Sequence, residues 1–419
     1  MLPTLTAEEK LHSEAVTALI RSRIEAAGGW ISFADFMETA LYAPGLGYYS
    51  AGSVKLGASG DFVTAPEISD LFSRCVARQC ADVLAATGGD ILELGAGTGR
   101  MAACVLQSLA EIGVLPERYA ILEVSGDLAE RQRARLASLP KELQERVVWL
   151  DSLPTAPMRG VILANEVLDA LPVQRFVVRD GVARELGVGL MDAMRDSGES
   201  AVFGSQESLA IPGVGASGSA AGRLGWRGSA AEVGGDRFGW LESSGEVVDV
   251  DVAGLPDGYL SEVCTRVDPW IAGVGQCLAR GALLLFDYGL PRAHYYHPQR
   301  VDGTLRCYFK QRAHDNPFIN IGVQDITAWV DFTRVADAAL ADGLDVAGFV
   351  TQAAFLLGNG IEAMTLEVED VAARARLAGE ARRLLMPGEM GESFKVMALC
   401  RDIDVTLRGF ALQDLRRSL

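Results

Sequence analysis

Short apolar runs, each followed by polar or acidic residues, alternate along the chain with segments of helical periodicity. The apolar runs predict strands at 91–94, 119–124, 147–150, 160–164, 282–286, 346–351 and 394–400. Apolar positions three and four residues apart predict helices at 7–27, 71–86, 101–112, 260–279, 325–341 and 363–385. Strands that alternate with helices form a mostly parallel sheet with helices on both faces, so the predicted fold class is a doubly wound α/β sheet.

Breaks in this pattern predict how the chain is organised. A glycine pair at 28–29 ends the first helix, and a second short helix follows it. Asp180-Gly181 between two apolar runs predicts a hairpin of 173–178 with 182–190. Four segments are expected: a helical N-terminal region (1–86), a first part of the ligand-binding core (87–190), a flexible Gly/Ser-rich insertion (191–237) and the rest of the core with substrate-facing insertions (238–419).

The most informative stretch is residues 91–100 (ILELGAGTGR), in which an apolar strand runs into Gly95, Gly97 and Gly99 with Glu93 two residues before them. Glycines allow a backbone with φ > 0 or one that lies against a ligand, and the following helix begins at this turn. A dinucleotide-binding turn requires G-x-G-x-x-G/A, which this sequence lacks, so a dehydrogenase is disfavoured. The G-x-G-x-G spacing resembles class I methyltransferases that bind S-adenosyl-L-methionine, with Glu93 facing the cationic methionine end. A purely structural turn is the alternative.

Two acids lie at the ends of the next predicted strands. Glu123 lies a little over 20 residues past the loop, where a doubly wound fold places the carboxylate that accepts ribose hydroxyls. Asp151 follows the strand after that and could accept a hydrogen bond from an adenine amino group. The alternatives are an exposed acid at a strand end for Glu123 and a loop acid that caps a turn for Asp151.

The fourth apolar run leads into Asn165, Glu166 and Asp169, the second candidate site. Two acids three residues apart on a helical turn project on one face. Paired carboxylates grip a guanidinium group bidentately, and Asn165 could orient the nucleophile through its carbonyl. The alternative is that Asn165 caps a helix whose first turn carries two ordinary acids.

A Gly-, Ser- and Thr-rich loop precedes the helix at 71–86. Within it Gly60, Asp61, Thr64 and Glu67 are candidates for a flap over the ligand, with Glu67 holding the methionine ammonium or a substrate arginine. Equally, Thr64 and Glu67 form a T-x-x-E capping box at a helix start.

Composition narrows the function classes. The net charge of −17 and the lack of a basic stripe with interleaved aromatics argue against nucleic acid and favour a cationic partner. No apolar run approaches the roughly 18 residues that a membrane span needs, and the acidic N-terminus resembles no targeting segment, so a cytoplasmic protein is expected. The seven scattered cysteines and four histidines lack ligand spacing, and no metal site is predicted.

Further motifs carry a resemblance to the MidA-like family, whose mitochondrial members are complex I assembly factors. They cover nearly the whole chain outside the insertion: YAPGLGYY at 42–49, GDFVTAPEIS at 60–69, Asn165-Glu166 with 169–172, Asp287-Tyr288-Gly289, GTLRCY at 303–308, Asp325 to Thr327 with 330–332, and Thr351-Gln352. The resemblance implies an S-adenosyl-L-methionine-dependent protein arginine methyltransferase, which in the mitochondrial case symmetrically dimethylates a complex I subunit. Tyr288, Arg306 and Tyr308 are further residues of these motifs that could line a substrate channel.

The chain departs from the family pattern at 319–323 and at Trp329, where we would expect a Pro-Gly-Glu-like turn and a histidine. These departures leave the cofactor motifs intact and bear on the identity of the substrate. Two other functions stay open: a methyltransferase acting on a small molecule, and a cofactor-binding assembly chaperone with little turnover. The oligomeric state is also open, with a homodimer as one option.

Overall fold

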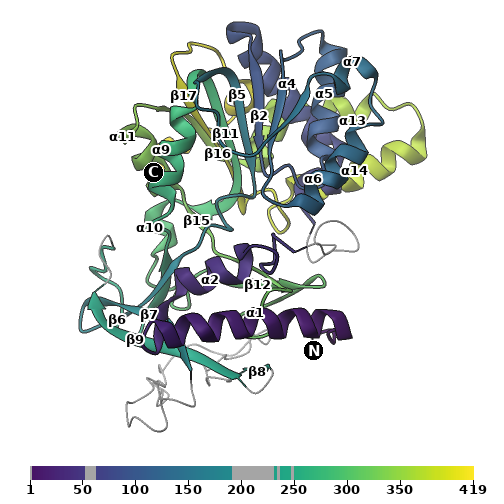
Figure 1. Cartoon of the computed structure of the whole chain (residues 1–419). Helices are drawn as coiled ribbons and strands as arrows, with labels where there is room; N and C mark the ends of the chain where they lie inside the picture. The colour runs from purple at the N-terminus through teal and green to yellow at the C-terminus, as the bar shows by residue number, and fades with distance from the viewer. Residues whose placement is uncertain (1, 52–62, 191–230, 234–235, 247–249) are drawn as a thin grey trace.

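A computed structural model describes residues 2–51, 63–190, 231–233, 236–246 and 250–419 (Figure 1). A large sheet flanked by helices forms the upper part of the molecule in this view, and a smaller sheet packed on the N-terminal helices forms the lower part. The cavity described below lies where the two parts meet.

The large sheet has eight strands and confirms the predicted doubly wound, mostly parallel fold class. Seven strands lie in the order β16-β17-β11-β5-β2-β3-β4, and β15 pairs with β11 beside this path. Only β17 runs antiparallel to its neighbours β11 and β16. The strands are β2 (Asp90–Leu94), β3 (Tyr119–Leu122), β4 (Val147–Leu150), β5 (Met158–Asn165), β11 (Leu278–Leu290), β15 (Val330–Asp331), β16 (Asp345–Thr351) and β17 (Phe394–Arg401).

The direction of winding changes between β2 and β5. From β2 the chain continues to β3 and β4 on one side, then crosses to β5 on the other side of β2. In doubly wound sheets this switch leaves a crevice outside the carboxyl ends of the strands, where ligands bind. The fold thus places a site between the glycine loop after β2 and the segment after β5.

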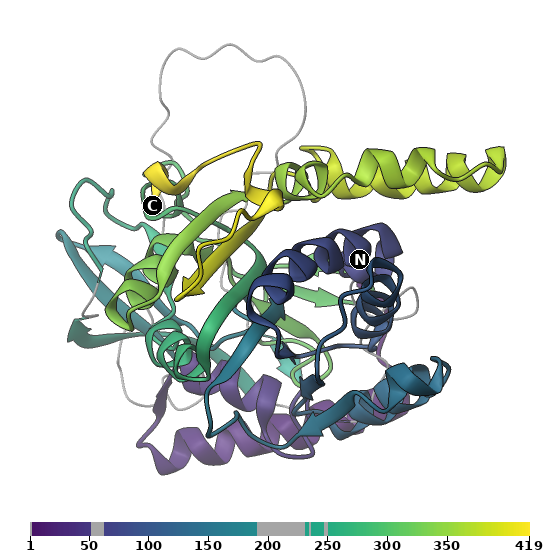
Figure 2. The ribbon, with the colours of Figure 1, turned by 90° about the horizontal axis from the view of Figure 1, so that it is seen from above.

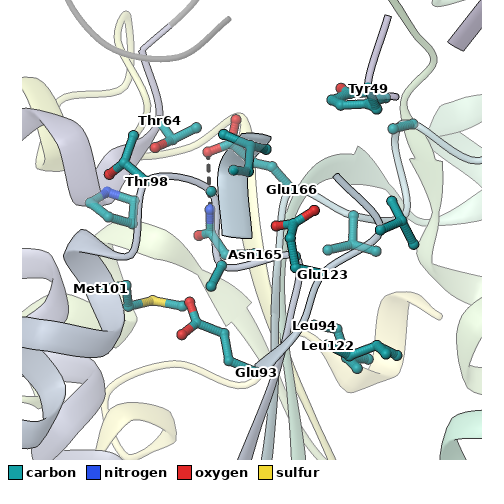
Figure 3. A pocket seen from close by; sticks show the side chains of 18 of the residues that line it. Tyr49, Thr64, Glu93, Leu94, Thr98, Met101, Leu122, Glu123, Asn165 and Glu166 are labelled. Carbon is teal, nitrogen blue, oxygen red and sulfur yellow. Dashed lines mark hydrogen bonds between the residues drawn. The ribbon is translucent and has the colours of Figure 1, made fainter. Parts of the chain in front are cut away.

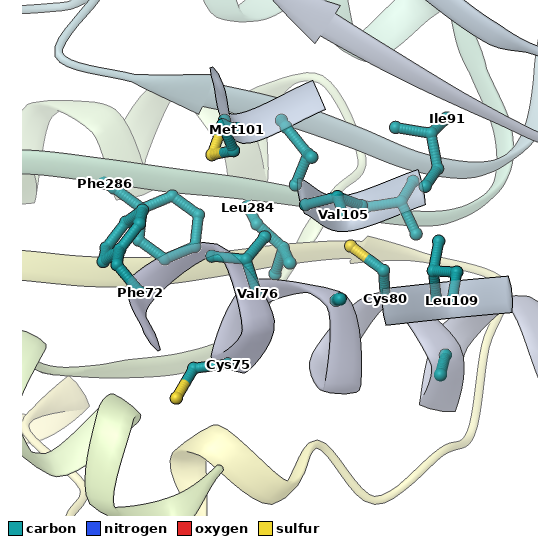
Figure 4. Close-up of a cluster of buried hydrophobic side chains, with 14 of the residues drawn as sticks. Phe72, Cys75, Val76, Cys80, Ile91, Met101, Val105, Leu109, Leu284 and Phe286 are labelled. Carbon is teal, nitrogen blue, oxygen red and sulfur yellow. The ribbon is translucent and has the colours of Figure 1, made fainter. Parts of the chain in front are cut away.

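Helices cover both faces of the large sheet, as the view from above shows (Figure 2). One face packs on α4 (Asp70–Thr87), α5 (Arg100–Ile112) and the C-terminal helices, and the other packs on α9 (Val267–Gln276) and α11 (Phe332–Ala341). Because β11 is covered on both sides, its run at 282–286 is apolar throughout, with Leu284 and Phe286 facing α4 and Leu283 and Leu285 facing the opposite core (Figure 4).

The smaller sheet is antiparallel and was not predicted as a whole. Its strands are β1 (Trp30–Ser32), β6 (Gln174–Arg179), β7 (Val182–Leu190), β8 (Ala231–Val233), β9 (Asp236–Glu246) and β10 (Leu260–Val263). A three-stranded sheet of β12 (Arg306–Phe309), β13 (Arg312–His314) and β14 (Asp325–Thr327) lies nearby. Residues of both sheets share a core with α1 (Ala7–Ala26) and α2 (Phe33–Tyr42).

Several predicted elements match the structure. The helices at 7–27, 71–86 and 101–112 correspond to α1, α4 and α5, and the hairpin at 173–190 is formed by β6 and β7. Ser32 caps α2 by accepting a hydrogen bond from the backbone N–H of Asp35 at 3.0 Å. The remaining helices of the described residues are α3 (Ala65–Ile68), α6 (Gly126–Leu136), α7 (Lys141–Gln144), α10 (Arg292–Tyr295), α12 (Gln352–Gly358), α13 (Ile361–Leu366), α14 (Val371–Leu385) and two 3₁₀ turns, Arg408–Phe410 and Arg416–Ser418.

Three predicted helices were wrong in part. The segment predicted as one helix at 260–279 begins with β10, because residues 260–263 pair with β6 and a strand pairing overrides local propensity. The segment at 325–341 begins with β14 and β15, and its helix begins only after Asp331, whose side chain accepts hydrogen bonds from the backbone N–H groups of Thr333 and Arg334. The helix at 363–385 is two helices, α13 and α14, and α12 before them was missed.

The predicted segment boundaries at 86, 190 and 237 stay predictions, and strand pairings cross them. Strand β1 of the first segment pairs with β7 of the second segment. Strand β9, which begins in the third segment and continues in the fourth, also pairs with β7. Most of the predicted insertion, residues 191–230, lies outside the described residues, while its end forms β8 and the start of β9. In the described part of the chain, no helix combines the length and the apolar character needed to cross a membrane.

The packing of β11 against α4 predicts a large stability effect. Leu284 is fully buried, so Leu284→Ala should lower the free energy of unfolding by about 2–5 kcal/mol through lost burial and a residual cavity. Leu340→Ala is the matched control, because Leu340 is 58% exposed and the same truncation should cost within about 0.5 kcal/mol. Urea unfolding measures both, and similar losses in the two variants would contradict the packing described.

Candidate active site

A cavity of ≈ 330 Å³ lies at the carboxyl ends of β2, β3 and β5 (Figure 3). Its wall combines the glycine loop, the ends of β3 and β5, the turn α3, part of α9 and two tyrosines of the N-terminal region. Twelve polar or glycine residues of the wall are Tyr42, Tyr49, Thr64, Glu67, Glu93, Gly95, Gly97, Thr98, Arg100, Glu123, Asn165 and Glu166. Most of the predicted site residues are therefore brought to one cavity.

The glycine loop turns with positive φ at Gly95 (67°), Gly97 (52°) and Gly99 (77°). Gly99 is the N-cap of α5, and a Cβ atom there would lie 3.2 Å from Cα of Gln132. Gly95 and Gly97 lie on the cavity wall, whereas Gly99 is not among the lining residues. The turn needs its glycines both for conformation and for the close approach of α6.

Glu93 lies on β2 and is almost completely buried, yet its carboxylate reaches the cavity wall. The hydroxyl of Tyr119 donates a hydrogen bond to Glu93 Oε2 at 2.7 Å. Burial raises the pKa of Glu93 to about 7, since desolvation disfavours the charged carboxylate. The glycine loop thus begins beside a carboxylate for which a bound cation would be favourable.

Glu123 follows β3 and accepts hydrogen bonds from the backbone N–H of Ser125 and from Gln132 Nε2, both at 2.9 Å. Gln132 Nε2 also donates to the carbonyl of Gly97 at 2.9 Å, and Trp149 Nε1 donates to Gln132 Oε1 at 3.0 Å. The fully buried Gln132 therefore joins the loop to Glu123. The sequence analysis missed it, although its spacing of four from Leu128 places it on the inner face of α6.

Another predicted residue, Asp151, is not among the residues that line the cavity. Asp151 directly follows β4, is exposed and does not line the wall, so its contact with an adenine amino group stays a prediction. Gly60 and Asp61 lie outside the described residues.

Thr64 and Glu67 line the cavity, and the capping-box alternative for them was wrong. Thr64 is the N-cap of α3, but its side chain makes no cap hydrogen bond. The Glu67 carboxylate instead accepts a hydrogen bond from the hydroxyl of Thr98 in the glycine loop. Arg100 Nη1 donates to the backbone carbonyl of Glu67 at 2.7 Å, so α3 is bound to the loop at two points.

Glu166 directly follows β5 with φ of 53°, a left-handed conformation that is uncommon for a residue with a side chain. Its carboxylate accepts hydrogen bonds from Asn165 Nδ2 at 3.2 Å and from the backbone N–H of Ala65. Desolvation, followed by repulsion from Asp169, raises the pKa of Glu166 to about 8. Figure 3 shows Asn165 and Glu166 at the cavity with this hydrogen bond drawn.

The predicted helical turn after Asn165 was wrong, and so was the alternative of a capped helix. Residues 166–171 form an irregular turn, because Asp287 Oδ2 of β11 accepts the backbone N–H groups of Leu168 (2.9 Å) and Asp169 (3.3 Å). These contacts hold the turn from outside, so no helix is needed to satisfy the backbone. Burial raises the pKa of Asp287 well above its usual range, and repulsion from the carboxylates of Asp169 and Glu166 adds to this effect.

Asp169 is buried beside Glu166 but is not among the residues that line the cavity. The hydroxyl of Tyr288 donates a hydrogen bond to the Asp169 carboxylate, and burial raises the pKa of Asp169 to about 6. Within the described chain, Asp169 Oδ1 has no hydrogen-bond partner. Glu166 therefore faces the cavity, and Asp169 adds a second negative charge next to it.

Two tyrosines complete the Glu166 side of the site. The sequence had indicated them only as part of the motif at 42–49. The rings of Tyr42 and Tyr49 stack with centroids 5.5 Å apart, and both line the cavity. Tyr42 donates to the carbonyl of Ala170, and Tyr49 donates to Asp325 Oδ1, each at 2.9 Å. Their presence in the family motif YAPGLGYY was the signal in the sequence that could have placed them at the site.

The other motif residues, Tyr288, Arg306 and Tyr308, are not among the residues that line the cavity. Tyr288 binds Asp169, and Tyr308, whose pKa is raised by burial and then by Asp169 and Asp325, lies close to the same acids. Arg306 Nη1 forms an ion pair with Asp315 Oδ1 at 3.0 Å. Among the described residues, no group of three or more His, Cys, Asp or Glu side chains is arranged to hold a metal ion.

The known proteins to which this chain is similar are methyltransferases. A family model for S-adenosyl-L-methionine-dependent methyltransferases matches residues 75–350. The mitochondrial protein arginine methyltransferase NDUFAF7 of Danio rerio is 27% identical over 417 residues, covering 92% of this chain and 87% of the relative. NDUFAF7 of Mus musculus is 28% identical over 426 residues, covering 93% and 86%.

Two solved structures from Burkholderia thailandensis resemble the whole chain. One, bound to S-adenosyl-homocysteine, is 37% identical with a TM-score of 0.86. The other, a native structure, is 36% identical with a TM-score of 0.83, and both comparisons cover 100% of each chain.

The bridging contacts of Gln132 predict a binding effect. Gln132→Ala removes its hydrogen bonds to Gly97, Glu123 and Trp149, and should weaken S-adenosyl-homocysteine binding about tenfold, measured by titration calorimetry. Gln144→Ala is the control, because Gln144 also bonds backbone carbonyls but lies on α7 away from the wall. An unchanged dissociation constant in Gln132→Ala would contradict this role.

The raised pKa of Glu166 predicts a pH-dependent stability effect. Below about pH 4.5 the carboxyl is protonated in both folded and unfolded chains. Between there and about pH 8 the unfolded chain releases the proton and the folded chain retains it, so Glu166 makes folding less favourable as the pH rises. Glu166→Gln should raise the melting temperature by about 2 °C or more at pH 8 and much less at pH 5.

Scanning calorimetry across this pH range tests the effect. Glu142→Gln, at a side chain that is 75% exposed, should show no such pH-dependent gain. If the gain in Glu166→Gln were constant with pH, the carboxyl would not hold its proton in the folded chain.

Proposed function

The chain belongs to the family of S-adenosyl-L-methionine-dependent methyltransferases, and we propose that its methyl acceptor is a guanidinium nitrogen of an arginine in a protein partner. The observation that carries the proposal is the carboxylate of Glu166 on the cavity wall, with Asp169 beside it. In the described part of the chain, no cationic side chain is among the hydrogen-bond donors of Glu166. Two carboxylates so placed favour a cationic acceptor.

The residues of the glycine-loop half fit the cofactor. The cavity there has a loop whose glycines leave backbone accessible, a buried acid at Glu93 and a two-oxygen acceptor at Glu123. We assign Glu93 to the methionine end and Glu123 to the ribose hydroxyls. When bound, S-adenosyl-L-methionine supplies an electrophilic methyl carbon on a sulfonium group.

Glu166 and the tyrosines serve the acceptor half. A guanidinium group offers flat arrays of N–H donors that match a carboxylate, and its charge would replace the proton that Glu166 otherwise holds at neutral pH. The faces of Tyr42 and Tyr49 suit the same flat cation. These side chains bind and orient the acceptor nitrogen, and such orientation contributes much of the rate in a displacement reaction.

Glu166 also provides a destination for the released proton. Methylation breaks the carbon–sulfur bond, forms a carbon–nitrogen bond and frees one N–H proton of the guanidinium group. Without a bound cation, burial and repulsion from Asp169 raise the pKa of Glu166, so its carboxylate takes up a proton as the methylated guanidinium leaves. In the proposal, Glu166 binds the cation during transfer and holds a proton once the product has left.

The names of the relatives support this acceptor. The mitochondrial relatives are named protein arginine methyltransferases, and the chain is similar to them over about nine-tenths of its length. A complex I subunit as the target remains an expectation from the family resemblance. The cytoplasm as the compartment is our expectation from the sequence, and the mitochondrial names belong to the relatives.

Labelled methyl transfer tests the acceptor. Wild-type protein with labelled S-adenosyl-L-methionine should label protein in a cell extract, and mass spectrometry should place the methyl groups on arginine. Glu166→Gln should lower kcat/KM about 100-fold or more, because a buried guanidinium loses its counter-charge, while S-adenosyl-homocysteine binding changes less than about threefold. Glu142→Gln should retain wild-type activity.

Other outcomes select the alternatives left by the sequence. Label found only in small molecules would indicate a small-molecule methyltransferase. Partner assembly that survives in Glu166→Gln while transfer is lost would favour a scaffold function. If no protein arginine changed its methylation between cells with and without this protein, the proposal would fail.

A further inference from the structure

The turn α3 lies between the two halves of the site and contacts both. Toward the acceptor half, the backbone N–H of Ala65 donates to the Glu166 carboxylate. Toward the cofactor half, the Glu67 carboxylate accepts from Thr98, and the Glu67 carbonyl accepts from Arg100 at 2.7 Å. Figure 3 shows Thr64, at the start of this turn, beside Thr98 at the cavity.

The charge of Glu67 is already satisfied within the protein. Besides the Thr98 hydroxyl, Arg100 Nη1 lies 3.8 Å from Glu67 Oε2. Arg100 Nε is in turn held by Asp70 Oδ1 at 2.9 Å, at the start of α4. A carboxylate that already has two partners is stabilised less by a bound ammonium group than a carboxylate without partners. The contacts of Glu67 therefore favour a role in holding α3 in place.

We infer that Glu67 is a positioning residue: by fastening α3 to the glycine loop it sets the hydrogen bond from Ala65 to Glu166, and so couples the cofactor loop to the acceptor carboxylate. The coupling is independent of the acceptor, and the naming of Glu166 as the acceptor carboxylate rests on the proposed function. Because such coupling is reciprocal, a ligand that orders the loop also favours the charged form of Glu166.

Carboxyl titration measures the coupling without catalysis. Protein labelled with ¹³C at glutamate carboxyls is titrated by NMR, and Glu166→Gln assigns the Glu166 signal. Thr98→Val removes the donor to Glu67 with little change of shape, and Glu67→Ala removes the acceptor. Both should raise the apparent pKa of Glu166 by about 0.5 or more as the Ala65 contact loosens, and Glu67→Gln, which can still accept from Thr98, should restore most of it.

Kinetics separates positioning from simple cofactor binding. At saturating S-adenosyl-L-methionine, Thr98→Val and Glu67→Ala should lower kcat about tenfold, with less than about a threefold change in the KM for the cofactor. A raised cofactor KM with unchanged kcat would overturn the inference, since Glu67 would then act only on the ligand. Glu142→Gln is the matched control and should change neither quantity.

The two readouts keep the inference and the proposed function apart. If wild-type protein methylates no arginine but the Glu166 pKa still responds to Thr98→Val, the coupling stands and the acceptor proposal fails. If arginine methylation is intact while Thr98→Val and Glu67→Ala leave both kcat and the Glu166 pKa unchanged, the coupling is overturned. Melting curves identify any variant that does not fold, and Thr98→Val then decides the question.

Discussion

The cost of removing carboxylates from water governs the architecture around the cavity. Among the described residues in and beside the cavity wall, an uncharged group donates a hydrogen bond to each of three acids: Tyr119 to Glu93, Asn165 to Glu166 and Tyr288 to Asp169. Hydrogen bonds from uncharged groups offset only part of the desolvation penalty, so the carboxyls keep raised pKa values. The protein thus bears a local electrostatic cost that a bound cation would relieve.

The two halves of the site are assembled in different ways. The cofactor half comes from consecutive elements, β2, α5, β3 and α6, whose contacts are close in sequence. The acceptor half combines chain segments that are far apart, with Tyr49 bonded to Asp325 and Leu168 bonded to Asp287 more than 100 residues away. Tyr49 follows α2 and Asp325 begins β14, whereas Leu168 follows β5 and Asp287 lies on the neighbouring strand β11 (Figure 1).

This difference explains what the sequence could predict. The glycine loop, Glu93 and Glu123 were found because a strand, a turn and a helix leave local marks in the pattern. The segment after Asn165 was assigned to a helix because an Asn followed by two acids looks like a helix start, and nothing nearby reveals that Asp287 supplies the contacts instead. The strand β10 was mistaken for helix for the same reason, since its partner β6 lies about 85 residues earlier.

The position of β17 has a consequence for how the chain folds during synthesis. This strand, near the C-terminus, lies between β11 and β16, and β16 pairs with no other strand of the described sheet. Until β17 has been synthesised, β16 has no partner in the described sheet and the edge of β11 beside it is open. Completion of the sheet therefore waits for β17, and the exposed edge of β11 is the place where a chaperone would protect the protein from aggregation.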